Sequence, residues 1–250
     1  MRQLPSGALL LLLAALGAAA AAAPRPQLLI VTEISPPSVI LEHGRLAGFT
    51  TDKVREIMAR ARVDVQIQLW PFKRGYLLAQ TRPDVCIFSL TRLPERETLF
   101  KWVGPTHESD WTLFGRADRD YHVSKLEDAR QYHIGTFFGD ARGDALSAMG
   151  YTVEPVRDRL SNPRKLLLER IDLWASSLQM GGKLIAENGW EKQIVPVLTF
   201  RRTELYLACN VALPDALVAS MNAALRAMNS EGVSGAIERS YHGTPVTPRR

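Results

Sequence analysis

Apolar and polar residues alternate in two similar series along the chain, and the first series predicts three strands with two helices between them. Short apolar runs typical of strands occupy residues 27–33, 63–70 and 84–90. The segments between them, 50–61 and 73–80, carry apolar residues at helical spacing. This βαβαβ order predicts a parallel sheet with helices on its faces.

The second series begins after residue 109 and repeats the same order of elements. Strands are predicted at residues 133–138, 152–156, 171–177, 193–200 and 203–210, and helices at 140–150, 162–170, 178–189, 215–229 and 231–241. Because the order occurs twice, we expect an α/β protein with two lobes, each built on a mostly parallel sheet flanked by helices.

The two lobes are expected to be joined by two crossing strands. One strand leads outward near residues 110–116 and the other returns near 200–208. We predict that lobe 1 comprises residues 27–112 plus 205–243 and that lobe 2 comprises 113–204. The cleft between them, at the carboxyl ends of the strands, is where such α/β proteins bind ligands.

Residues 1–23 differ from the rest of the chain. Arg2 is followed by an apolar run at 8–16 and by alanines up to Ala23, the pattern of a cleaved secretory signal peptide. An uncleaved membrane anchor is the alternative. No later stretch approaches the roughly 20 apolar residues that cross a bilayer, so we expect a soluble, exported mature chain with a disordered tail at 244–250.

Composition and charge narrow the possible partners. Hydrophobic residues make up 46% of the 250 residues and charged residues 23%, so the chain can bury a sizeable core. Without Arg2, 30 Lys and Arg face 26 Asp and Glu, and these basic residues are dispersed, which argues against a nucleic-acid partner. The 5 histidines occur singly, so we expect neither a metal site nor a cofactor.

The two cysteines, Cys86 and Cys209, each lie in an apolar segment typical of a strand. An oxidising compartment would permit them to form a disulfide. Two cysteines far apart in sequence say nothing about their distance in space, so buried free thiols are the favoured interpretation and a disulfide is the alternative.

Four segments occur in an order that resembles a known family: GRLAGFTTDKVREIMARA, PDVCIFSLTRLPERETLFKWVGP, HIGTFFGD and ERIDLWASS. They resemble bacterial periplasmic solute-binding proteins of family 3, the amino-acid type, over about residues 28–243. The resemblance implies a two-lobe periplasmic protein that is a monomer and not an enzyme. It would close on a small polar solute bearing a carboxylate, an amino acid or related organic acid, and deliver it to the permease of an inner-membrane ABC importer.

The resemblance also implies one half of a binding site in lobe 1. Ser89 and Thr91, at the end of the strand at 84–90, would offer hydroxyl and backbone N–H groups to the cleft. Arg96 matches the family arginine that grips the ligand carboxylate, a task suited to a planar guanidinium. The alternative for Arg96 is a surface ion pair with Glu95, Glu97 or Asp84. Arg92 is either solvated or lies at the edge of the cleft.

In lobe 2 the sequence departs from the family pattern at two places. Gly139, Asp140 and Ala141 stand where the family usually has Gly-Ser/Thr-Thr, at the start of a helix that could receive an anion. Asp140 would either contact ligand or act as a plain N-cap. Ser177 stands where amino-acid binders carry the carboxylate that pairs with the ligand ammonium, so either the ligand lacks an α-ammonium group or Asp140 or Glu33 supplies the charge.

Aromatic residues are expected to form the apolar walls of the cleft. Trp70 and Phe72, at the end of the strand at 63–70, are placed to stack on ligand, and Arg74 could add a second anion contact. Packing of Trp70 on the core is the alternative. Three other tryptophans are expected to pack in the core or hinge: Trp102, Trp111 and Trp174.

Two other functions remain open from the sequence. A two-lobe exported dehydratase would need a positioned general acid or base, and Glu33, Asp140 and His107 are candidates. No Ser-His-Asp, Cys-His or metal-ligand arrangement is visible in the sequence. A soluble partner of a membrane-bound sensor is the second alternative.

Overall fold

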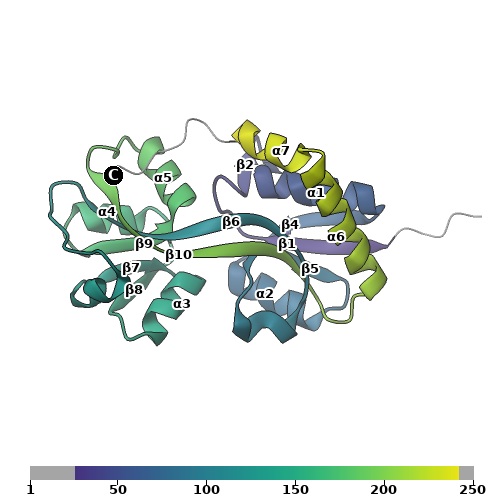
Figure 1. Cartoon of the computed structure of the whole chain (residues 1–250), viewed down its shortest axis with the longest axis horizontal. Helices are drawn as coiled ribbons and strands as arrows, with labels where there is room; N and C mark the ends of the chain where they lie inside the picture. Colours follow the sequence, from purple (N-terminus) through teal and green to yellow (C-terminus); the bar gives the residue numbers. More distant parts are fainter. Residues whose placement is uncertain (1–25, 242–250) are drawn as a thin grey trace, which may run out of the picture.

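The computed structural model describes residues 26–241, and within this range the elements form two groups joined by two long strands (Figure 1). We keep the names lobe 1 for the group with α1, α2, α6 and α7, and lobe 2 for the group with α3, α4 and α5. The predicted signal peptide at 1–23 and the predicted tail at 244–250 lie outside the described residues. Among residues 26–241, no helix has the length and apolar content needed to cross a membrane.

A single eight-stranded sheet runs through both lobes in the order β4-β1-β5-β10-β6-β9-β7-β8. Its centre is the antiparallel pair of 16-residue strands β6 (Lys101–Arg116) and β10 (Ile194–Cys209). These two strands are the predicted connections between the lobes, and they are longer than the predicted segments 110–116 and 200–208. Because both strands belong to both lobes, the residue at which lobe 1 gives way to lobe 2 remains a prediction.

Lobe 1 contains the predicted parallel strands, with β1 between β4 and β5. Neighbouring residues of a strand face opposite sides of a sheet, so Ile30 packs in one core with Val54 and Ile57 of α1, while Val31 packs in the other with Ala79 of α2. The elements of this lobe are β1 (Gln27–Thr32), β2 (Ile40–Glu42), β3 (Arg45–Ala47), α1 (Phe49–Ala61), β4 (Asp64–Leu69), α2 (Phe72–Thr81), β5 (Val85–Thr91), the 3₁₀ helix η1 (Pro94–Leu99), α6 (Asp215–Ser230) and α7 (Val233–Tyr241).

Lobe 2 repeats the arrangement with β7 between β8 and β9, all parallel. Leu173 and Trp174 of β9 enter different cores, as do Leu113 and Phe114 of β6. The elements of this lobe are the 3₁₀ helix η2 (Leu126–Gln131), β7 (Ile134–Phe137), α3 (Ala141–Ala148), β8 (Val153–Val156), α4 (Ser161–Leu167), β9 (Leu173–Ser177) and α5 (Leu178–Glu187).

The cysteines form a disulfide, so the favoured prediction of free thiols is wrong. Cys86 of β5 and Cys209 of β10 are direct neighbours in the antiparallel ladder, with sulfur atoms 2.04 Å apart and no solvent exposure. The sequence separation of 123 residues hid this proximity, because it is the return of β10 to lobe 1 that brings the two strands together.

Candidate ligand-binding cleft

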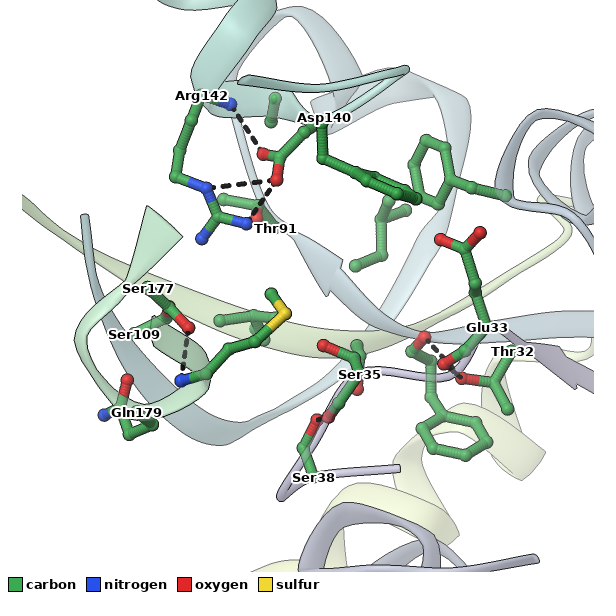
Figure 2. Close-up of a pocket in the computed structure, with 18 of the residues that line it drawn as sticks. Thr32, Glu33, Ser35, Ser38, Thr91, Ser109, Asp140, Arg142, Ser177 and Gln179 are labelled. Carbon is green, nitrogen blue, oxygen red and sulfur yellow. Dashed lines mark hydrogen bonds and ion pairs between the residues drawn. The ribbon is translucent and has the colours of Figure 1, made fainter. Parts of the chain in front are cut away.

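A cavity lies between the two lobes, at the carboxyl ends of β1, β5, β7 and β9 (Figure 2). This is the position that the parallel strand order predicts for a ligand site. The cavity volume is about 120 Å³. A cavity needs about 10 to 15 Å³ to hold one water molecule. This cavity therefore has room for about ten water-sized groups, which corresponds to about ten non-hydrogen atoms of a small metabolite.

Most of the predicted site residues line this cavity. From lobe 1 and lobe 2 together these are Glu33, Phe72, Ser89, Thr91, Arg96, Gly139, Asp140, Ala141 and Ser177. Trp70 and Arg74 are not brought to it. The Trp70 indole N–H donates to Gln68 Oε1 at 2.9 Å, and the Arg74 guanidinium lies over the Trp70 ring at 4.3 Å, so the two side chains satisfy each other outside the cavity.

Arg96 and Arg92 lie four positions apart and have different surroundings. Arg96 lines the cavity, lies over the Tyr76 ring, and donates from Nη1 to the Thr91 carbonyl oxygen at 3.2 Å. No carboxylate within residues 26–241 forms an ion pair with it, so the surface-pair alternative does not hold. Arg92 instead pairs with Glu97 through both Nε and Nη2 and lies outside the cavity. Arg96 is therefore the arginine of this segment whose charge is available in the cleft.

Ser89 reaches the cavity through an unusual backbone conformation. Its φ is 60°, in the left-handed region that non-glycine residues rarely occupy. Its Oγ is buried and has no hydrogen-bond partner among the described residues. A buried hydroxyl without a partner costs free energy, and strain of this kind gathers at binding sites. The conformation thus holds a polar group ready in the cavity wall.

Asp140 is the N-cap of α3, and it is engaged by Arg142. Its Oδ1 accepts the Arg142 backbone N–H at 2.9 Å, and its Oδ2 accepts Arg142 Nε at 3.1 Å and also Nη2. Both side chains are almost fully buried, at 13% and 11% exposure. Asp140 therefore both caps α3 and lines the cavity, but its negative charge is already paired with the Arg142 guanidinium.

Glu33 faces Arg159 across the cleft. Arg159 Nη2 and Glu33 Oε2 are 3.4 Å apart, and Arg159 also lies over the Phe137 ring at 4.2 Å. Burial raises the pKa of Glu33, an effect that the opposite charge of Arg159 reduces. Burial likewise lowers the pKa of Arg159. Asp140 and Glu33 were the two carboxylates that could supply the negative charge absent at Ser177. Glu33, like Asp140, is thus paired with an arginine.

Ser177 acts as the N-cap of α5. Its Oγ accepts the Met180 backbone N–H at 3.1 Å. The other polar side chains drawn near it in Figure 2, Ser109 and Gln179, are neutral. The end of β9 therefore presents hydroxyl and amide groups to the cavity and no charge of its own.

His107 lies in the cavity wall on β6, where Nδ1 is 3.1 Å from Thr50 Oγ1 and the ring makes an edge contact with Phe49. Burial lowers the pKa of His107 to about 3, and the nearby Lys53 charge adds to this effect. The imidazole is therefore neutral at physiological pH and contributes shape and hydrogen bonding to the site.

Sequence reasoning missed several residues of the cavity, above all Arg142 and Arg159. Arg142 directly follows the predicted site residues 139–141, so its proximity to Asp140 was a usable signal. Arg159 follows β8 in a segment without a motif, and no pattern in the sequence indicates that it turns toward Glu33.

Two lobes of this topology, joined by paired strands around a small polar cavity, are typical of solute-binding proteins. A family model for bacterial extracellular solute-binding proteins, family 3, matches residues 28–244. The chain belongs to this family, which confirms the resemblance drawn from the four segments. Among curated proteins, none matches the chain in sequence.

Solved structures share the fold at low sequence identity. An ancestral arginine-binding protein bound to arginine has a TM-score of 0.76 at 20% identity, covering 88% of this chain and 99% of its own. A histidine kinase sensor domain with similarity to periplasmic binding proteins has a TM-score of 0.79 at 17% identity, covering 88% and 97%. The GluR0 ligand-binding core from Nostoc punctiforme, in complex with L-glutamate, has a TM-score of 0.75 at 16% identity, covering 86% and 98%. These likenesses confirm the two-lobe fold.

Proposed function

We propose that the protein binds a small carboxylate-bearing solute in its cleft and delivers it to the permease of an ABC importer. The solute is held when the two lobes close. Membership of an extracellular solute-binding family supports binding as the activity, and a cavity of about 120 Å³ supports a solute of metabolite size.

The observation that carries this proposal is the state of Arg96. Its guanidinium lines the cavity and has no carboxylate partner among residues 26–241, while Ser89 Oγ in the same cavity wall has no hydrogen-bond partner there. A guanidinium pairs with a carboxylate through two parallel hydrogen bonds, and Thr91 adds a hydroxyl at the same strand end. This set of donors matches one carboxylate of a bound solute.

Substitution of Arg96 tests the proposal. We expect Arg96→Gln to weaken solute binding by about 2 to 5 kcal/mol, the cost of truncating one partner of a buried charge pair. Isothermal titration calorimetry with small carboxylic acids and amino acids provides the measurement. Arg92→Gln is the matched control, because it removes an arginine four positions away that pairs with Glu97 outside the cavity. Equal affinities of Arg96→Gln and the unsubstituted protein would contradict the proposal.

We further propose that the protein works in the periplasm as a monomer, after removal of the predicted signal peptide at 1–23. The pattern of Arg2 and the apolar run at 8–16 supports export. Dispersed charge supports a small-molecule partner over nucleic acid.

Sensing is the second candidate function. The likeness to a histidine kinase sensor domain favours it, because the same two-lobe module serves there outside a transporter. Catalysis is less favoured by the cleft: His107 is neutral and bonded to Thr50, and the two candidate carboxylates, Glu33 and Asp140, are each paired with an arginine. Binding of the solute without turnover, followed by mass spectrometry of the recovered solute, separates binding from catalysis.

A further inference from the structure

Arg142 places a buried positive charge in the lobe 2 half of the cleft. It is the second residue of α3, is 9% exposed, and lines the cavity. Its Nε and Nη2 donate to Asp140, whereas Nη1 has no hydrogen-bond partner among residues 26–241. Figure 2 shows the guanidinium reaching from α3 toward the interior of the cleft beside Asp140. One edge of this guanidinium therefore remains available to a ligand.

A second buried arginine reinforces the charge at this place. Arg142 and Arg159 both line a small recess that opens from lobe 2 beside the main cavity, together with Asp140 and Met180. Burial lowers the pKa of Arg159, and the positive charge of Arg142 adds to this effect. Two guanidinium groups, each paired with a carboxylate, thus lie on the wall opposite Arg96.

The carboxylates of the cavity are few and already engaged. Glu33 and Asp140 are the acidic residues of the cavity wall within residues 26–241. Asp140 accepts three N–H groups of Arg142, and Glu33 faces Arg159. With Arg96 assigned to the ligand carboxylate, the two arginines of lobe 2 each engage one of these carboxylates, which leaves no unpaired acid for an ammonium group.

The end of β9 is also suited to an acceptor on the ligand. Ser177 Oγ accepts the Met180 N–H, so the Ser177 hydroxyl proton remains free to be donated. Donors from Ser177 and from Arg142 Nη1 lie on the lobe 2 wall, where the one carboxylate, Asp140, already accepts three N–H groups of Arg142.

We propose that Arg142 determines specificity by excluding an α-ammonium group, so that the solute is a small carboxylic acid without one. The inference rests on the proposed function, because Arg96 must first fix the carboxylate in the cleft. An ammonium group brought beside Arg142 and Arg159 meets two guanidinium groups in a desolvated site whose carboxylates are already engaged, and we expect this to lower its affinity by more than about tenfold. An uncharged or anionic group at the same place meets donors instead.

Matched pairs of ligands that differ only in the ammonium group test the inference on the unsubstituted protein. The pairs are L-glutamate with glutarate, L-leucine with 4-methylpentanoate, and L-arginine with 5-guanidinopentanoate, each titrated by calorimetry. We expect the ammonium-free member of each pair that binds to bind at least about tenfold more tightly. Tighter binding of the amino acid would overturn the inference and leave the proposed function standing. Failure of both members of all pairs to bind would overturn both.

Substitutions at Arg142 test the residue itself. Arg142→Gln frees Asp140 to pair with an ammonium group, so the preference is expected to shift toward the amino acid by at least about tenfold. Arg142→Lys keeps the charge and is expected to keep the preference. Arg157→Gln is the control, because Arg157 belongs to the same lobe and lies over the Phe138 ring but does not itself line the cavity. An unchanged preference in folded Arg142→Gln, or an equal shift in Arg157→Gln, would overturn the assignment.

Discussion

The polar groups of the cleft are held at the carboxyl ends of strands by local features of single residues. Ser89 adopts a left-handed conformation, Asp140 and Ser177 cap the helices that follow their strands, and Arg96 is aimed by a bond to the Thr91 carbonyl. Each feature fixes a side chain before any ligand arrives. A site whose groups are already ordered loses less conformational entropy on binding.

At the residue scale, His107 makes the stability of the protein depend on pH. Its folded-state pKa is about 3, against 6.5 in an unfolded chain, so the unfolded chain binds more protons between these values. The stability that neutral His107 contributes is therefore fully present above pH 6.5 and is lost as the pH falls toward 3. We expect this residue to contribute a loss of about 1 to 2 kcal/mol between pH 7 and pH 5.

Urea unfolding at both pH values measures this contribution. His107→Asn keeps a polar group near the Nδ1 position that contacts Thr50 but cannot be protonated. The difference in unfolding free energy between pH 7 and pH 5 should shrink by about 1 to 2 kcal/mol in the variant. Glu33 titrates in both proteins, so its contribution cancels in the comparison. An identical pH dependence in the two proteins would show that His107 does not carry it.

The residues of the cleft differ in how readily the sequence reveals them. Ser89 and Thr91 lie at the end of an apolar strand and Arg96 follows it in a motif, so their place in the cavity could be predicted. Arg142 was indicated only by its place next to Asp140, and Arg159 was indicated by no pattern, because most arginines of a folded protein are solvated. The direction in which each arginine side chain points depends on how both lobes pack, and only the structure shows this packing.

At the element scale, the order of strands and helices followed from hydrophobic periodicity. The predicted helices at 50–61 and 178–189 correspond to α1 and α5, whose apolar faces pack on the sheet. The joining of both lobes by one continuous sheet was not predicted, because β10 was predicted as two short strands, at 193–200 and 203–210, and β6 only as a connecting segment near 110–116. The disulfide was missed for the same reason, because Cys86 and Cys209 become neighbours only through the position of β10 beside β5 in this sheet.

The disulfide between β5 and β10 is expected to stabilise lobe 1. It closes a loop of 123 residues, which restricts the unfolded chain, and such bonds contribute about 2 to 5 kcal/mol. Urea unfolding with and without reductant measures the contribution. Reductant should destabilise the unsubstituted protein by this amount and leave the Cys86→Ala/Cys209→Ala protein unchanged. Alkylation of both cysteines in the unfolded, unreduced protein would show that the bond is absent.

At the scale of the whole molecule, the two lobes touch on both sides of the cavity. Leu93 from lobe 1 packs with Trp111 and Ala141 in an apolar cluster. At the cleft mouth, Lys73 of α2 lies over the Phe138 ring at 4.3 Å. Contacts of this kind, together with the ion pair between Glu33 and Arg159, join groups on opposite lobes and so belong to a closed arrangement.

We expect the contact between Lys73 and Phe138 to link solute affinity to the proposed lobe closure. If the two residues separate when the lobes open, their interaction favours the closed state that holds the solute. A cation lying over an aromatic ring contributes about 0.5 to 1 kcal/mol at an exposed site, and Phe138 is 36% exposed. A double-mutant cycle of Lys73→Met and Phe138→Ala, measured as solute affinity by calorimetry, should give a coupling free energy of about that size.

The control cycle replaces Lys73→Met with Arg157→Gln, because the contact of Arg157 with Phe138 lies within lobe 2 and is expected to persist on opening. If the coupling free energy of the control cycle were as large as that of the first cycle, Phe138 would act through its own lobe. The contact between Lys73 and Phe138 across the cleft would then not contribute to solute affinity.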